Sequence, residues 1–378
     1  MKNKTAGPLL KHFSIITDPR LDNHNREHKL IDIIIVTICA VICGADDWVS
    51  IERWAKTKET WLRQFLELPS GIPSHDTFGR VFSLLNPQEF QQSFLSWVQT
   101  ASKITDGQIV AIDGKTVRRS YNQKLGKNAI HMVSAFATAN GLALGQVKVD
   151  NKSNEITAIP KLLKMLEIAG CIITIDAMGC QTEIAETIIK QGADYVLAVK
   201  GNQGNLYRDL KTIFANLSKT EHDHYETHES GHGRLEQRDC WAICGTKSLK
   251  KIRNADQWAQ LTSIAKVTSQ RTIGNKTTND TRYYVSTLPG DAKQILNATR
   301  SHWQIENGLH WILDVAFRED DSRIRKDHAP ENLATIRHIA LNLLKQEKTA
   351  KVGIKNKRLM AGWNENYLQK VLGVSRKN

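Results

Sequence analysis

The segment QIVAIDGK (Gln108–Lys115) is an apolar, strand-like run that ends on an acidic side chain, and CIITIDAMG (Cys171–Gly179) repeats the arrangement. Asp113 follows the first run and Asp176 the second. An aspartate before a glycine also commonly caps a turn, so Asp113 alone does not distinguish a site from a turn. The second copy favours a site, because open α/β sheets build their sites at the carboxyl ends of strands.

The sequence around these two runs predicts an α/β fold with a mixed sheet. QIVAI, IHMVSAFATA and LALGQVKV are three strand-like runs between Gln108 and Val149. Helical and strand patterns then alternate: a helix over 154–169, a strand over 171–175, a helix over 181–191, a strand over 194–199 and a helix over 204–217. Three strands followed by this alternation are typical of a mixed sheet with helices.

The flanking segments divide the chain further. Residues 1–105 are predicted to form a helical domain, with helices over 29–44, 48–68 and 74–85 and another from Asn86-Pro87. Residues 218–290 turn polar and β-leaning, which indicates a β subdomain inserted into the core of 106–217 plus 291–345. Helices are predicted over 291–317 and 331–344, and 346–378 form a basic tail without a clear core pattern.

Charge and length restrict the function classes. The 378 residues exceed what one hydrophobic core usually supports, so more than one domain is expected. Fifty-two Lys and Arg against 39 Asp and Glu give a net charge of +13, which favours nucleic acid as a partner. The longest apolar run, Ile33–Ala45, is too short to span a membrane, and we expect a cytoplasmic protein. The six cysteines lack the paired spacing of a zinc site and are interpreted as reduced thiols.

Two aspartates on neighbouring strands repel each other unless they share a hard cation such as Mg²⁺. A third ligand is available in SHWQIENGLHWILDVAF, where His302, Glu306, His310 and Asp314 recur at helical spacing on one face. A solvated polar stripe on an amphipathic helix explains the same spacing.

Eight segments together identify a family resemblance. The chain resembles the DDE transposases of bacterial insertion sequences, in the branch of the H-repeat-associated proteins. The segments are IPSHDTFGRVF (72–82), IDGKTVRRS (112–120), HMVSAF (131–136), KSNEITAIPKLL (152–163), TIDAMGCQ (174–181), YVLAVKGNQ (195–203), HGRLEQR (232–238) and HWQIENGLHWILDVAFRED (302–320).

The resemblance implies a ribonuclease-H-like catalytic core whose acidic triad is Asp113, Asp176 and Glu306. It also implies two Mg²⁺ or Mn²⁺ ions per site, double-stranded DNA as substrate and a dimer on DNA. Cutting at the element's ends and strand transfer into target DNA would use the same site. Related transposases carry the signature Tyr-x2-Arg-x3-Glu-x6-Lys around the glutamate. In this chain the glutamate is Glu306, but the Tyr, Arg and Lys positions hold Thr299, His302 and Leu313, so the signature is absent.

Further side chains are hypothetical DNA contacts, each also explicable as ordinary surface or turn. These are Lys115, Arg118 and Arg119 after the first strand, Lys200, Asn202 and Gln203 after the strand over 194–199, His302, and the alternating His232, Arg234, Glu236 and Arg238. Glu155 is interpreted as a helix-start residue, and Arg80 as part of a packed helix rather than a recognition helix. A nuclease without strand transfer and a non-catalytic DNA-binding protein are the competing functions.

Overall fold

The computed structural model describes residues 7–21, 26–101, 106–121, 126–150, 153–217, 222–231 and 233–373. Within these residues the strands form one sheet in the order β3-β2-β1-β4-β5-β9-β8-β7-β6. Their bounds are β1 Ile109–Thr116, β2 His131–Ala137, β3 Leu142–Lys148, β4 Ile172–Ile175, β5 Asp194–Val199, β6 Asp223–Gly231, β7 Arg234–Cys244, β8 Ser263–Ile273 and β9 Lys276–Ser286. The predicted α/β class is confirmed.

Strand β1 lies at the junction of two kinds of pairing. It pairs antiparallel with β2, which pairs antiparallel with β3. On its other edge it runs parallel to β4, and β4 runs parallel to β5. An antiparallel meander joined to parallel strands at β1 is the ribonuclease-H-like mixed sheet that the resemblance implied.

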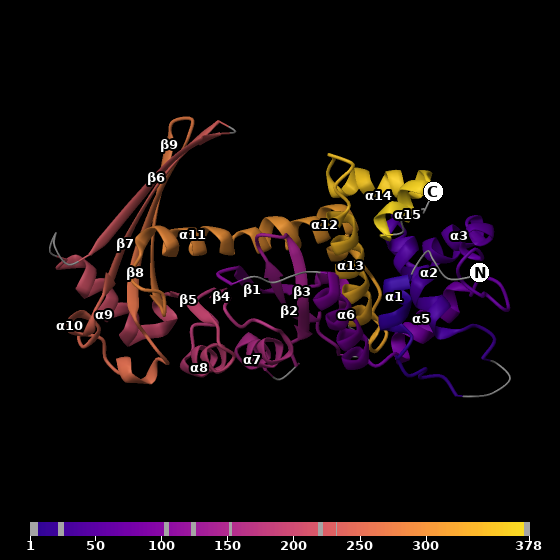
Figure 1. Cartoon of the computed structure of the whole chain (residues 1–378), viewed down its shortest axis with the longest axis horizontal. Helices are drawn as coiled ribbons and strands as arrows, with labels where there is room; N and C mark the ends of the chain where they lie inside the picture. The colour runs from indigo at the N-terminus through magenta and orange to yellow at the C-terminus, as the bar shows by residue number, and fades with distance from the viewer. Residues whose placement is uncertain are drawn as a thin grey trace.

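Strands β6–β9 extend this same sheet. β9 pairs antiparallel with β5 from Val196↔Ser286 to Val199↔Tyr283, and β8, β7 and β6 follow antiparallel. The segment predicted as an inserted β subdomain therefore has no separate sheet among the described residues, because its strands continue the core sheet outward (Figure 1). The division of the chain into domains stays a prediction.

Helices cover both faces of the sheet. α7 (Glu155–Met165) and α8 (Thr182–Lys190) lie on one face, with α9 (Gly204–Ala215) beyond them, and α11 (Ala292–His302) crosses the other (Figure 1). The helix predicted over 291–317 is interrupted: Trp303 is a turn, Glu306–His310 form a π-helix and α12 covers Trp311–Phe317. Short π-helical turns inside α-helices occur frequently at functional sites.

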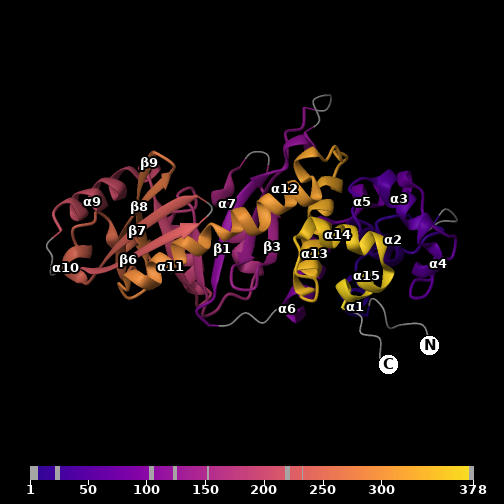
Figure 2. The ribbon, with the colours of Figure 1, turned by 90° about the horizontal axis from the view of Figure 1, so that it is seen from above.

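A group of helices from both ends of the chain packs beside β3, and we call this group the helical domain. It contains α1 Gly7–Phe13, α2 Leu30–Ile42, α3 Trp48–Thr57, α4 Glu59–Leu62, α5 His75–Leu84 and α6 Pro87–Ala101, together with α13 Ala329–Gln346, α14 Ile354–Trp363 and α15 Glu365–Val371. α13 is buried along nearly its whole length between these helices and β3 (Figure 2).

Two helix predictions are corrected here. The helix predicted over 48–68 ends at Thr57, because the chain makes a turn at Lys58 before the short α4. The segment predicted as a tail without a core pattern contains α14 and α15, whose Tyr367, Leu368 and Val371 are buried. None of the described helices combines the length and the apolar character needed to cross a bilayer.

Candidate active site

The strand register brings the two predicted aspartates side by side. Ile112 of β1 pairs with Ile175 of β4, so Asp113 and Asp176 are the next residues on two parallel neighbours. Glu306 reaches them from the π-helix above the sheet. The three carboxylates line one pocket of about 210 Å³, which we call the carboxylate pocket; Lys200, Arg282, His302 and Trp303 also line it.

The carboxylate pocket concentrates negative charge. Burial, together with the neighbouring charges of Glu306 and Asp176, raises the pKa of Asp113 to about 7. Three negatively charged carboxylates around one cavity provide the oxygen donors that bind a hard divalent cation. In the described part of the chain no three side chains are already arranged around an ion position, so the fit rests on the chemistry of the donors.

The loop after β4 is held by side chains that the sequence suggested as DNA contacts. Asp176 Oδ1 accepts hydrogen bonds from the backbone N–H of Met178 at 3.0 Å and of Gly179 at 3.4 Å. Asn202 Nδ2 donates to Ala177 O at 2.8 Å, and Gln203 Nε2 donates to the carbonyl of Cys180 at 2.5 Å. These two amides therefore order the loop that carries Asp176.

Two buried histidines flank the carboxylates. His310 Nδ1 lies 3.4 Å from Asp113 Oδ2, and burial lowers the pKa of His310 to about 4. His302 Nδ1 lies 3.1 Å from Thr174 Oγ1, and burial likewise lowers its pKa to about 4. Burial therefore favours the neutral form of both rings.

Lys115 lies in a buried ion network. Its Nζ is 2.7 Å from Asp314, 3.1 Å from Glu319 and 3.1 Å from Asp320, and Glu319 also pairs with the buried Arg337 at 3.4 Å. The network joins β1 to α12 and α13. The ammonium group thus faces carboxylates inside the protein, contrary to the phosphate contact suggested by the sequence.

The remaining predicted DNA contacts lie apart from one another. Arg118 and Arg119 are exposed and pair with Asp320 at 3.1 Å and Asp321 at 3.5 Å. Lys200 is exposed at the rim of the carboxylate pocket, with no described carboxylate in ion-pair distance.

The basic residues of β7 lie on the outer part of the sheet. Arg234 pairs with Glu236 at 3.4 Å, and Arg238 pairs with Glu229 at 3.1 Å and with Glu236. His232 lies outside the described residues.

Sequence reasoning missed two side chains at the pocket. The guanidinium of Arg282, on β9, lies 4.6 Å from the ring centre of Trp303, and Trp303 is 44% exposed. The signal available in the sequence was a cation beside the aromatic pair in TRYYVST. Glu155, interpreted from the sequence as a helix-start residue, begins α7; its Oε1 lies 2.6 Å from His131 Nε2, and its charge contributes to the raised pKa of Asp113.

Comparison with known proteins identifies the family. Residues 104–343 match the family model described as transposase DDE domain, and residues 10–98 match the one described as DDE_Tnp_1-associated. Two relatives are named putative transposases. The H repeat-associated YhhI of Escherichia coli K12 is 44% identical to this chain, and the alignment covers 97% of this chain and 98% of YhhI. YncI of Escherichia coli O157:H7 is 43% identical, and the alignment covers 96% of this chain and 94% of YncI.

Among solved structures, a piggyBac transposase synaptic complex with hairpin DNA aligns with 97% of this chain and 78% of its own, at a TM-score of 0.42 and 11% identity. The family model over 104–343 and relatives matched along nearly the whole length show the family. The chain belongs to the DDE transposases, in their H-repeat-associated branch.

Proposed function

We propose that this chain cleaves phosphodiester bonds at the ends of its insertion sequence and joins the exposed 3′-hydroxyls to target DNA. The observation that carries the proposal is the convergence of Asp113, Asp176 and Glu306 on one pocket. Their mutual repulsion, expressed in the raised pKa of Asp113, is relieved by a bound cation.

Asp113, Asp176 and Glu306 are the proposed ligands of two divalent ions, Mg²⁺ or Mn²⁺. Bound ions of this type activate a hydroxyl nucleophile and stabilise the leaving oxygen of a phosphodiester. The protein's part is positioning: Asp113 lies within β1, Asp176 directly follows the parallel strand β4, and Glu306 lies on a π-helix packed over the sheet.

Lys200 and Arg282 supply positive charge at the pocket and are the proposed contacts for the scissile phosphate. Arg118 and Arg119 are further proposed phosphate contacts on the exposed surface beyond β1. Because transposition brings two element ends together, we propose that two copies act as a dimer on DNA.

The test uses the full-length protein and a labelled duplex that carries the element's own ends, with Mg²⁺ or with EDTA. Asp176→Asn is the sharpest variant, because its side-chain oxygen still accepts from Met178 N and the loop keeps its shape. Glu167→Gln, at an exposed position, is the matched control.

The proposal is supported if the wild type and the control give joined products that depend on the metal and Asp176→Asn gives none. Normal cutting and joining by Asp176→Asn would overturn the triad. Cutting without joining supports a nuclease instead, and binding without cutting supports a non-catalytic DNA-binding protein.

A further inference from the structure

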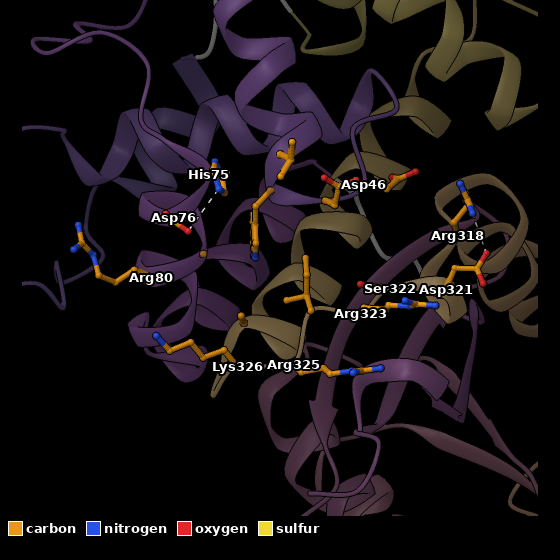
Figure 3. A pocket seen from close by; sticks show the side chains of 16 residues that line it. Asp46, His75, Asp76, Arg80, Arg318, Asp321, Ser322, Arg323, Arg325 and Lys326 are labelled. Carbon is orange, nitrogen blue, oxygen red and sulfur yellow. Dashed lines mark hydrogen bonds and ion pairs between the residues drawn. The ribbon is translucent and has the colours of Figure 1, made fainter. Parts of the chain in front are cut away.

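A second hollow, of about 770 Å³, lies between the helical domain and the segment that follows α12 (Figure 3). One wall consists of the start of α3 and of α5, and the other of residues 318–326. We call it the interdomain cleft. Asn332 Nδ2 donates to Phe82 O and to Leu85 O, both at 2.9 Å, and His328 N donates to Ser83 O at 3.3 Å. These bonds fix the two walls together, so the interdomain cleft is preformed.

The acidic side chains of the interdomain cleft are mostly engaged with partners in the protein. Asp46 pairs with the buried Arg358 at 2.5 Å, and Asp321 pairs with Arg318 at 3.4 Å. Asp47 caps α3. The fourth acidic side chain, Asp76, is exposed and lies 3.7 Å from His75 Nε2. None of the four carboxylates lies within ion-pair distance of Arg80, Arg323 or Lys326.

Three cations of the interdomain cleft have no such partner. Arg80 on α5 and Arg323 and Lys326 on the opposite wall are exposed, and no described carboxylate lies within ion-pair distance of them. Figure 3 shows Arg80 and Lys326, from opposite walls, on one side of the interdomain cleft, while Arg323 extends toward the other. Unpaired cations on both walls of a groove attract a polyanion.

A further groove, on the outer strands and α11, is lined by Arg238, Arg271 and Arg300 among other residues, and it differs in this respect. There Glu229 pairs with Arg238 at 3.1 Å and with Arg300 at 2.6 Å, and Glu236 pairs with Arg271 at 3.5 Å. These three arginines already pair with carboxylates, whereas three cations of the interdomain cleft do not, so the interdomain cleft is the better site for phosphates.

The position of the interdomain cleft relative to the carboxylate pocket follows from the chain. Glu306 and Arg318 are separated by twelve residues of π-helix and α-helix, which at about 1.5 Å each span at most roughly 18 Å. This is about five base-pair steps of about 3.4 Å. Resting on the proposed function, we propose that the interdomain cleft binds the sugar–phosphate backbone of duplex DNA about five base pairs from the bond that is cut.

The experiment compares three full-length proteins: the wild type, the triple variant Arg80→Gln, Arg323→Gln, Lys326→Gln, and a control triple variant. The control replaces Lys164, Lys190 and Lys211, exposed lysines of the helices α7, α8 and α9, with Gln, so that net charge is matched. Affinity for a fluorescein-labelled 40-base-pair duplex of arbitrary sequence is measured by anisotropy at several salt concentrations in EDTA.

Each phosphate contact contributes about 0.9 to the slope of log affinity against log salt. For the triple variant of Arg80, Arg323 and Lys326, the cleft variant, we expect this slope to decrease in magnitude by about 2 to 3. Its affinity near 0.1 M salt should fall roughly tenfold to hundredfold. The control variant should keep the wild-type slope. Equal slopes for the two triple variants would overturn the proposal.

Failure of the interdomain cleft and failure of the proposed function give different results. Asp176→Asn should bind the duplex with the wild-type slope while cleaving nothing. If the slope changes as expected but no protein cleaves element ends, the cleft is a DNA site and the catalytic proposal fails. If the wild type cleaves and the cleft variant keeps the full slope, the catalytic proposal stands and the cleft proposal fails.

Discussion

Replacing Asp113 with Asn should stabilise the metal-free protein at pH 8. The native pKa of Asp113 is about 7, against an ordinary value of 3.8. Between these values the native state holds a proton that the unfolded chain has lost, so stability falls as pH rises from about 4 to about 7 and stays low above that. The difference corresponds to a cost on the order of 4 kcal/mol at pH 8. At pH 5 the cost is less than half as large.

The assay is thermal unfolding in EDTA at pH 5 and pH 8. With about 2.1 cal/mol/K of unfolding entropy per residue, 378 residues give about 0.8 kcal/mol/K, so we expect Asp113→Asn to raise Tm by about 5 °C at pH 8. Glu167→Gln, at an exposed position, should leave Tm unchanged. Adding Mg²⁺ should raise the Tm of the wild type and much less that of the variant. Identical responses of wild type and Asp113→Asn to pH and to Mg²⁺ would refute a like-charged, cation-binding pocket.

Three further substitutions test the scaffold around the site. Glu319→Ala leaves two buried cations without their carboxylate and should lower the free energy of unfolding by about 3–5 kcal/mol, measured by urea titration. Asn332→Ala leaves two buried carbonyls without a donor and should cost about 1–3 kcal/mol in the same assay; no loss would show that water replaces the amide. Gly308→Ala places a Cβ 2.9 Å from a ring carbon of Phe136, so the substitution should displace Glu306. We expect cleavage to fall at least tenfold while DNA affinity is kept. Unchanged cleavage would show that the π-helix tolerates movement.

The part of the site that depends on local patterns was predictable from the sequence. Asp113 and Asp176 each end an apolar run, and period and turn signals locate such runs without knowledge of the fold. Glu306 has no comparable local signal, because every fourth residue of its helix is polar, and only the family resemblance singled it out. The π-helix that presents it was not expected.

Contacts between residues far apart in the sequence account for most of what was missed. Lys115 lies near the end of β1, at the start of a basic run typical of surface, yet its partner Glu319 is 204 residues away. Asn202 and Gln203 bond to a loop more than twenty residues earlier, which no spacing rule indicates. The C-terminal helices α14 and α15 are short and weakly patterned, and their burial depends on docking against α2 and α13.

The docking of α13 to α15 against the N-terminal helices has a consequence for synthesis. The helical domain contains helices from the first hundred residues, but its buried central helix begins only at Ala329. While the chain is being made, α2 and α5 present their apolar sides before the helix that covers them has left the ribosome. A copy of the gene that ends before Ala329 therefore yields a chain in which α2 and α5 expose apolar side chains to water. We expect such a chain to aggregate or to be degraded, whereas a copy that ends after α13 keeps these helices covered.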